Sequence, residues 1–419
     1  MQDNEKKPAL RFKGFTDPWE QRKLAELTKT ITTGKSVNSD EGEVSDGDIG
    51  VLKTSCVSYD RFNPSESKPV VKSEQQLVKC AVEKDSVIVS RMNTPERVGA
   101  CGYVSTDFPN LFLPDRLWKL KFQDTVDTYF VYMMLVSSAY KEKITSMASG
   151  TSGSMYNIPK ETFLNLQLVI PAKIDEQKQL GKILKKIDTL ITLHQRKYEK
   201  LVNIKKSMLD KMFPKNGASV PEIRFKGFTD LWEQRKLGEI AVFSKGVGYS
   251  KNDLCEEGTP IILYGRLYTK YETCIFDVDT FVKEKAGGVY SKGGEVIVPA
   301  SGEMAEDISI ASVVVKPGIL LGGDLNIVSP TAEYDSAFLA LTISSGATHK
   351  YLSSLAQGKS VVHLHNADIQ SVSAKFPTKR EQEKIHLLFR KIDTLITLHQ
   401  RKLKKLQNIK KSCLEKMFV

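Results

Sequence analysis

An internal duplication constrains this chain more than any other feature of its sequence. Residues 11–27, RFKGFTDPWEQRKLAEL, recur at residues 224–240 with 14 of 17 positions identical. Residues 186–213, KIDTLITLHQRKYEKLVNIKKSMLDKMF, recur at residues 391–418 with 23 of 28 positions identical. The stretches between these repeats share no extended identity. The chain therefore contains two regions of unlike sequence, here called bodies, and each is flanked by nearly identical copies of the same two segments.

Both copies of the second repeat predict a long amphipathic helix. Apolar residues recur at steps of three and four over about five heptads, with polar residues between them. We expect helices over residues 172–214 and 378–419, each spanning roughly 60 Å. The apolar stripe of one helix can be covered by the other, which predicts an antiparallel coiled coil with a pseudo-twofold between the bodies. A coiled coil with an outside protein is the alternative.

Eight residues of the stripes form the predicted helix interface. Each stripe contains a histidine at its centre, and a polar residue at such a position most often sets the register of pairing. A proton switch is the other interpretation of these histidines. The predicted interface consists of Ile187, Leu190, His194, Leu201, Ile392, Leu395, His399 and Leu406.

The rest of the chain predicts two mixed α/β bodies. We expect the first over residues 1–171, and a linker with the second over residues 215–377. Each copy of the opening motif, 11–27 or 224–240, contains one tryptophan, Trp19 or Trp232. We expect it to anchor the motif on its own body, with contact to a partner as the alternative. Short apolar runs bounded by Gly, Ser and Pro predict strands at residues 86–90, 165–170, 294–299 and 311–315, and helical segments at 125–146 and 334–354.

The positive charge of the chain is concentrated in the two helical segments. The net charge is +11, with 61 Lys and Arg against 50 Asp and Glu. Residues 174–215 carry 11 basic and 5 acidic side chains, and residues 379–419 carry 12 and 4. The bodies are therefore nearly neutral, which excludes a uniformly basic coat for nucleic acid.

The same composition indicates where such a chain would work. No apolar run approaches the ~18 residues that span a bilayer, and no apolar leader segment opens the sequence. The six cysteines are scattered without a CxxC pair, which is typical of reduced thiols. We expect a cytoplasmic protein with no membrane contact.

Catalytic signatures are incomplete. Residues 34–36 and 358–360 read Gly-Lys-Ser, like the end of a phosphate loop, but both lack its upstream glycine. Residues 66–68 read Glu-Ser-Lys, like a nuclease triplet, without a convincing upstream Asp. His363 and His365 could bind a metal, although an exposed loop is the more typical setting for such a pair. We expect a non-catalytic chain with no metal or cofactor of its own.

Polar loops of the bodies are the candidates for recognition of DNA. Arginine can bind guanine, asparagine can bind adenine, and small hydroxyl side chains can hold phosphates. A solvated turn is the alternative at each position. The predicted DNA-binding residues are Arg91, Asn93, Arg97, Thr151, Ser154, Tyr156 and Asn157 in the first body, and Ser301, Lys359, His363, His365 and Asn366 in the second.

With these features in view, the chain resembles the specificity (S) subunit of bacterial type I restriction–modification systems over essentially its full length. The two opening motifs and the twin KIDTLITLHQRK helices carry this resemblance. So do a proline followed by Glu-Gln at the end of each body, and the segments VIVSRMNTPERVGACGYV at 87–104 and GGEVIVPASGEMAEDISIASVVV at 293–315.

This resemblance implies a function. The bodies would be target recognition domains that each read one half of a split double-stranded DNA sequence. The helices would set the spacing and dock two methyltransferase (M) subunits, with restriction/translocase (R) subunits completing the complex. S-adenosylmethionine, ATP and magnesium would belong to those partners. Two other functions stay open, a coiled-coil adaptor without a DNA role and a self-contained nuclease or methyltransferase with an unrecognised motif.

Overall fold

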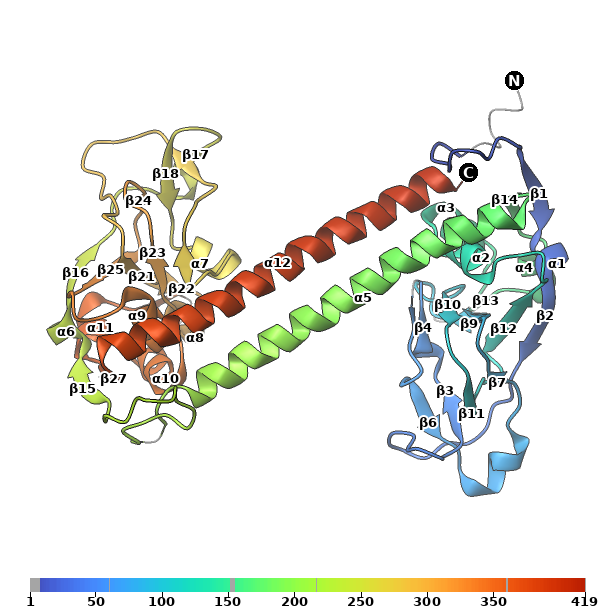
Figure 1. Cartoon of the computed structure of the whole chain (residues 1–419), viewed down its shortest axis with the longest axis horizontal. Helices are drawn as coiled ribbons and strands as arrows, with labels where there is room; N and C mark the ends of the chain where they lie inside the picture. Colours follow the sequence, from blue (N-terminus) through green and yellow to red (C-terminus); the bar gives the residue numbers. More distant parts are fainter. Residues whose placement is uncertain (1–7, 60, 151–154, 216, 359–360, 419) are drawn as a thin grey trace. The chain divides into compact units, whose positions relative to one another are not determined.

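The structure, a computed structural model, describes residues 8–59, 61–150, 155–215, 217–358 and 361–418 (Figure 1). The chain forms two compact units. Unit 1 comprises Met1–His194 and Lys402–Val419, and unit 2 comprises Gln195–Arg401. Each unit therefore contains one body, the start of one long helix and the end of the other.

The two long helices form as the sequence predicts. They are α5 (Ile174–Lys211), of 38 residues, and α12 (Lys379–Met417), of 39 residues. The first turn contains Asp175 and Glu176 in α5 and Glu381 in α12, and the last turn of each helix contains a lysine. These charges interact favourably with the helix dipole. Among the residues described, no helix is long and apolar enough to cross a membrane.

The helices pair antiparallel within each unit. In unit 1, Asp188 of α5 forms an ion pair with Lys410 of α12 at 2.8 Å. In unit 2, Lys205 of α5 forms an ion pair with Asp393 of α12 at 2.6 Å. The two pairs join equivalent positions of the repeat with the roles of the helices exchanged. The prediction of antiparallel pairing is confirmed.

The body of unit 1 is built on two four-stranded sheets, whose orders are β10-β8-β12-β2 and β6-β3-β11-β7. The central strand β8 has the sequence SVIVS and is buried throughout, which explains its uninterrupted apolar run. The strands are β2 (Thr28–Thr33), β3 (Gly50–Leu52), β6 (Ser67–Pro69), β7 (Ala81–Val82), β8 (Ser86–Ser90), β10 (Cys101–Val104), β11 (Phe108–Phe112) and β12 (Leu117–Phe122), with the small pair β4 (Val57–Ser58) and β5 (Arg61–Phe62) beside them.

The body of unit 2 has a main sheet with the same strand order and one additional edge strand, β19. A five-stranded sheet runs β16-β25-β21-β23-β19, and a four-stranded sheet runs β17-β20-β18-β24. The strands are β16 (Ala241–Lys245), β17 (Leu254–Cys255), β18 (Thr259–Ile262), β19 (Cys274–Ile275), β20 (Phe281–Val282), β21 (Glu295–Pro299), β23 (Ser312–Val314), β24 (Leu320–Leu321) and β25 (Leu325–Pro330).

Short helices cover the sheets in both units. Each predicted helical segment is present but consists of two helices. Ser137 and Ser345 are the N-cap residues of the second helix in unit 1 and in unit 2. The helices are α1 (Leu24–Leu27), α2 (Thr128–Leu135), α3 (Ser138–Ser146) and α4 (Lys160–Leu164) in unit 1, and α6 (Leu237–Ile240), α7 (Arg266–Thr269), α8 (Ala305–Ile308), α9 (Ser336–Ile343), α10 (Gly346–Leu355) and α11 (Asn366–Ser371) in unit 2, with 3-10 turns at Thr54–Cys56, Lys72–Leu77 and Lys251–Asp253.

The opening motif of each half forms an edge strand. In unit 1, β1 (Trp19–Lys23) pairs with β14 (Gln167–Pro171), and in unit 2, β15 (Glu233–Lys236) pairs with β27 (Ser373–Phe376). Trp19 and Trp232 are 1% and 3% exposed, which confirms them as anchors of their motifs. A repeated sequence thus closes two unlike bodies in the same way.

The far end of each helix enters the core of the other copy's body. Phe213, beyond the end of α5, stacks on Phe338 of α9 in unit 2 at 5.5 Å between ring centroids. Phe418, beyond the end of α12, contacts Phe130 of α2 in unit 1 at 5.5 Å. Each core therefore contains residues from both halves of the sequence, so neither half supplies a complete unit by itself.

Candidate nucleic-acid interface

The polar loop residues of the first body meet on a short two-stranded ribbon. Strand β9 (Met92–Asn93) follows the buried β8 after a single residue and pairs antiparallel with β13 (Tyr156–Asn157), with Tyr156 opposite Asn93. We call residues 91–97 and 156–157 ribbon 1. The structure thus brings two loops that are distant in the sequence to one edge of the body.

The side chains of ribbon 1 have different environments. Arg97 is exposed, and Arg91 is half-buried with its Nε donating to the carbonyl of Asp115 at 2.8 Å. Asn93 is only 7% exposed. Its Nδ2 donates to Ser90 Oγ at 3.0 Å, and its Oδ1 accepts the N–H of Thr94 at 2.9 Å. The Asn93 amide is therefore used to hold the turn.

Unit 2 contains an equivalent ribbon. Strand β22 (Ser301–Gly302) follows β21 after a single residue and pairs antiparallel with β26 (Val362–His363), with Ser301 opposite His363. We call residues 301–302 and 362–366 ribbon 2. Ser301 Oγ and His363 Nδ1 are hydrogen-bonded at 3.1 Å. The rings of His363 and His365, both exposed, are nearly parallel, with centroids 6.3 Å apart.

Two asparagines at the ribbons have a buried carbonyl oxygen without a donor among the described residues. They are Asn157, on β13, and Asn366, the first residue of α11. Asn366 is held in place because its Nδ2 donates to the carbonyl of Ser244 at 2.9 Å. A buried acceptor without a donor is costly, so these two oxygens are unsatisfied polar atoms within the ribbons.

Three predicted residues, Thr151, Ser154 and Lys359, lie outside the described residues. Two further residues lie at the ribbons and were not predicted. Arg116 is exposed, and its carbonyl accepts the N–H of Arg91 at 3.1 Å. The hydroxyl of Tyr268 donates to the carbonyl of Ser301 at 2.5 Å. Because both contacts join residues far apart in the chain, no local sequence pattern predicts them.

The motifs with a superficial likeness to catalytic sites have structural roles. Gly34 lies so close to the carbonyl of Leu113 that a Cβ would collide with it, and Ser36 Oγ donates to Asp115 Oδ1 at 2.5 Å. Lys68 forms an ion pair with Glu41 at 2.8 Å. Within the described part of the chain, no group of three or more His, Cys, Asp or Glu side chains could hold a metal ion.

The predicted helix interface is buried to different degrees. Ile187 and Ile392 are 8% and 7% exposed, whereas Leu395 is 43% exposed. The half-buried members are Leu190, His194, Leu201, His399 and Leu406. Position 395 therefore presents its side chain to solvent although its spacing fits the stripe.

Known proteins share this plan. The family model described as "Type I restriction modification DNA specificity domain" matches residues 16–203 and 229–408. The MjaVIII specificity subunit of a type I restriction enzyme from Methanocaldococcus jannaschii is 24% identical over 297 residues, which are 68% of either chain. The putative MjaX specificity subunit of the same organism is 21% identical over 94% of this chain and 91% of its own length.

A solved structure shares the fold. The S subunit of a type I restriction-modification system from M. genitalium superposes with a TM-score of 0.66 and 16% sequence identity, over 99% of both chains. The family model covers most of this chain in two copies, as the duplicated sequence predicts. The chain therefore belongs to the family of type I restriction–modification DNA specificity proteins.

Proposed function

We propose that the chain is the non-catalytic DNA specificity subunit of a type I restriction–modification complex. Ribbon 1 and its surroundings read one half of a bipartite double-stranded DNA target, and ribbon 2 and its surroundings read the other. The observation that carries this proposal is the recurrence of a polar ribbon at the same place in two bodies whose sequences are unlike. A shared frame with different reading surfaces is what a split, asymmetric target requires.

The chemistry of the ribbons supports base reading. Arg91 and Arg97 can donate to guanine in the major groove. Asn157 and Asn366 each have an amide oxygen that no donor among the described residues occupies. His363 brings an exposed imidazole next to the Ser301 hydroxyl. Asn93 is excluded from this set because its amide is already bonded within its own turn.

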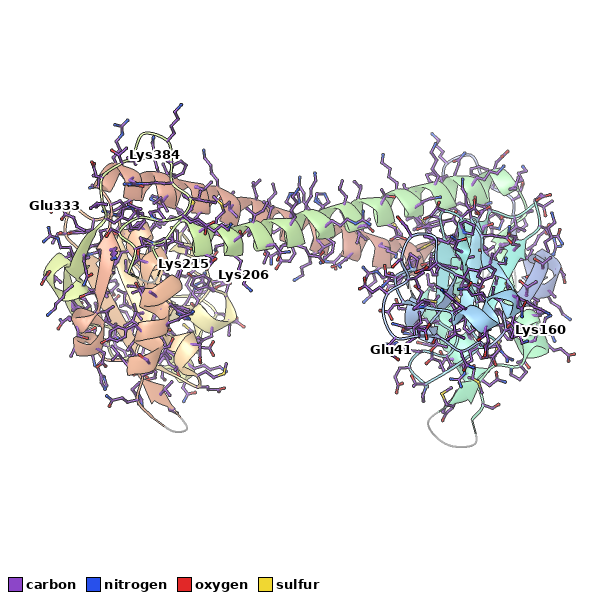
Figure 2. The ribbon with its side chains drawn as sticks, turned by 90° about the horizontal axis from the view of Figure 1, so that it is seen from below. Glu41, Lys160, Lys206, Lys215, Glu333 and Lys384 are labelled. Atoms are coloured by element: carbon purple, nitrogen blue, oxygen red, sulfur yellow. The ribbon has the colours of Figure 1, made fainter. Side chains whose placement is uncertain are left out.

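The helices supply the docking surface for two methyltransferase subunits. Leu193 and Leu398 occupy the same position of the repeat and are 44% and 42% exposed. Ile204 and Ile409 are likewise equivalent, at 38% and 40%. Exposed lysines such as Lys206 project from the same helices (Figure 2). Because both copies present this surface, a protein that binds one binds the other.

The remaining members of the complex follow from this assignment. S-adenosylmethionine, ATP and magnesium bind to the methyltransferase and restriction/translocase subunits. This chain determines which DNA sequence the complex recognises. The two half-sites are expected to lie about one turn of B-DNA apart, roughly 10 base pairs, so that both bodies reach the same face of the duplex.

Mapping of methylated adenines tests the proposal. The full chain is expressed with its methyltransferase subunit, and the methylated DNA is sequenced. We expect one bipartite motif with unread base pairs between its halves. Exchange of residues 25–171 for those of a relative is expected to change one half only, and a change in both halves would refute the assignment of one reader to each body.

The two alternative functions predict other outcomes. A coiled-coil adaptor would show no sequence-specific, salt-dependent binding of DNA in the assembled complex. A self-contained enzyme would cut or methylate DNA as the purified chain alone. Either result would replace the proposal.

A further inference from the structure

One carboxylate in unit 1 joins three parts of the fold. Asp188 on α5 accepts an ion pair from Lys410 of α12 at 2.8 Å and a hydrogen bond from the hydroxyl of Tyr129 on α2 at 2.5 Å. The Asp188 and Lys410 side chains are 23% and 14% exposed. Burial, together with the charge of Asp188, raises the pKa of Tyr129, so its hydroxyl stays protonated and donates.

The equivalent carboxylate in unit 2 makes the same kind of junction. Asp393 on α12 accepts an ion pair from Lys205 of α5 at 2.6 Å and a hydrogen bond from Thr273 Oγ1 at 3.1 Å. Thr273 precedes β19 in the body of unit 2. A helix lysine and a body hydroxyl therefore meet on one aspartate in both units.

The repeat explains only part of this agreement. The aspartates and lysines are identical because the helical sequences are repeated, but the hydroxyls come from unlike elements. Tyr129 lies in a buried helix, whereas Thr273 lies in a segment with irregular structure. Different elements of the two bodies therefore make the same kind of contact with the helix pair.

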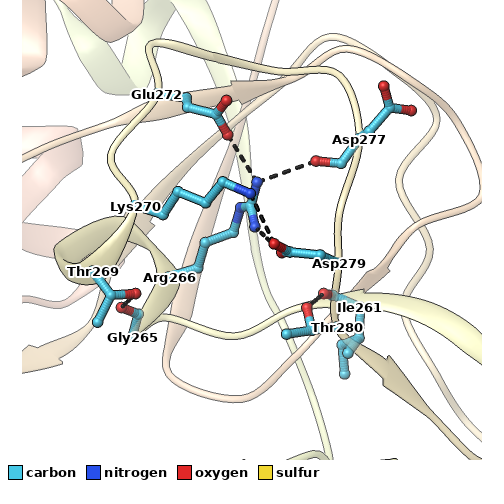
Figure 3. Close-up of polar contacts among 9 residues, drawn as sticks. All are labelled: Ile261, Gly265, Arg266, Thr269, Lys270, Glu272, Asp277, Asp279 and Thr280. Carbon is cyan, nitrogen blue, oxygen red and sulfur yellow. Dashed lines mark hydrogen bonds and ion pairs between the residues drawn. The ribbon is translucent and has the colours of Figure 1, made fainter. Parts of the chain in front are cut away.

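A buried arginine holds Thr273 at its aspartate. Arg266 is 7% exposed, and its guanidinium donates to Glu272 at 2.8 Å, to Asp279 at 2.8 Å and to the carbonyl of Asp277 at 3.1 Å (Figure 3). These partners lie on both sides of Thr273 in the sequence. The arginine therefore fixes the segment that presents the Thr273 hydroxyl to α12.

Aromatic contacts reinforce both junctions. In unit 1, Lys185 of α5 lies over the rings of Tyr103 and Tyr129 at 5.0 and 5.5 Å. In unit 2, Lys205 lies over Tyr271 at 5.9 Å, and Arg390 lies over Phe276 at 4.9 Å. Helix cations and body aromatics thus resist rotation of each body about its own helix pair.

We infer that Asp188 and Asp393 are positioning residues that set the angle of each recognition body on its helix pair, and with it the spacing of half-sites that the complex accepts. The inference rests on the proposed function. Each aspartate binds the opposite helix and the body at once, so a change in the angle would break a charge-assisted hydrogen bond. Neither aspartate needs to touch DNA for this role.

Removal of the body hydroxyls tests the inference. The full chain with Tyr129→Phe or Thr273→Val is assembled with its methyltransferase subunit. It is assayed on DNA substrates that carry the native half-sites with spacers one base pair shorter, native or one base pair longer. We expect methylation at the altered spacers to rise about tenfold relative to the unmodified chain, because one hydrogen bond to a charged acceptor is lost. The base preferences within each half-site stay unchanged.

Two variants serve as matched controls. Tyr59→Phe removes a hydroxyl that donates to the carbonyl of Val98 at 2.6 Å within the body of unit 1. Thr280→Val removes a hydroxyl that donates to the carbonyl of Ile261 at 2.6 Å within the body of unit 2. Neither of these bonds reaches a helix of the pair, so both controls are expected to keep the native spacer preference.

The outcomes separate the two hypotheses. If the unmodified complex methylates no bipartite sequence, the proposed function fails and takes the inference with it. If it does so and Tyr129→Phe matches Tyr59→Phe at every spacer, only the positioning role is overturned. Equal loss of methylation at all spacers, or altered reading of a half-site, would also overturn it.

Discussion

His386 Nδ1 lies 3.0 Å from Asp335 Oδ2 in unit 2, and unit 1 has no side chain at the equivalent position to make this contact. The position equivalent to His386 is Gly181, whose backbone lies so close to Asp127 Oδ1 that a Cβ would collide with it. Asp127 and Asp335 have the same task, since each accepts an N–H in the first turn of α2 or α9. Two equivalent helix caps therefore have different electrostatic environments.

The two caps are predicted to respond to pH in opposite ways. Burial raises the pKa of Asp127, and the N–H of Phe130 offsets only part of that rise. Burial also acts to raise the pKa of Asp335, but the hydrogen bonds from His386 and Phe338 outweigh it, so this pKa lies below its usual range. Asp335 thus stabilises unit 2 above the unfolded pKa of about 4 and loses this effect on acidification. Asp127 stabilises the folded form of unit 1 at low pH, and this contribution is lost as the pH rises through the raised pKa of Asp127.

Substitution by asparagine measures this difference. At pH 7, Asp335→Asn is expected to lower the free energy of unfolding of unit 2 by about 1 kcal/mol, whereas Asp127→Asn leaves unit 1 as stable as before or slightly more stable. Hydrogen exchange at the first turns of α9 and α2 reports each unit separately. Equal losses in both units at pH 7 would contradict the opposite pKa shifts.

A second prediction concerns the ion pairs that lock the opening motifs. Arg224 binds Glu381 through two contacts of 2.7 Å, and Glu381 is fully buried. Arg224→Met is expected to cost about 3–5 kcal/mol, because it leaves a buried charge without its partner. The double variant Arg224→Met/Glu381→Leu is expected to recover most of this loss, as measured by urea unfolding.

The equivalent pair in unit 1 provides a graded comparison. Glu176 accepts two bonds from Arg11 and a further one from Trp19 Nε1 at 3.3 Å. Arg11→Met is therefore expected to cost less than Arg224→Met. A larger loss of unfolding free energy for Arg11→Met than for Arg224→Met would show that the Trp19 N–H does not compensate the charge of Glu176.

The third prediction concerns docking on the helices. The unmodified chain is expected to bind two methyltransferase subunits, and Leu193→Glu or Leu398→Glu is expected to bind one, because each charge disrupts one copy of the exposed apolar surface. Native mass measurement gives the stoichiometry. Leu231→Glu is the control, since Leu231 is 70% exposed but lies outside the helices. Loss of both subunits from a single variant would contradict independent docking.

The fourth prediction concerns reading by ribbon 1. Arg91→Ala is expected to weaken discrimination at one half-site by about 1–3 kcal/mol, the usual value of a bidentate contact to guanine. Methylome sequencing should show degeneracy in that half alone. Arg22→Ala, on an exposed side chain paired with Glu26, is expected to leave both halves unchanged.

The last prediction concerns the rigidity of α5. Leu201→Pro removes a helix hydrogen bond and costs about 3 kcal/mol or more, so it is expected to abolish methylation that depends on both half-sites together. Leu201→Ala keeps the helix and is expected to retain most activity. A proline variant with full activity would show that a continuous helix is not needed to couple the two readings.

Some of the fold and of the site could be predicted and some could not. The strand at 86–90 was predictable because its apolar run is local, and the positions of Trp19 and Trp232 followed from their place in a repeated motif. The burial of Asn93 was not predictable, because its partner Ser90 reaches it only through the bend between β8 and β9. The exposure of Leu395 was not predictable either, since periodicity identifies a stripe but not its edge.

The amino-acid sequence alone determined that there are two bodies, two long helices and a duplicated frame, because near-identical segments with the same apolar spacing fold alike. Tertiary structure decided how these parts are combined into units. Phe213 belongs to the core of unit 2 and Phe418 to that of unit 1, because antiparallel pairing brings each helix end to the other copy's body. The meeting of Tyr129 with Asp188, and of Thr273 with Asp393, likewise depends on contacts between residues 59 and 120 positions apart, which no local pattern records.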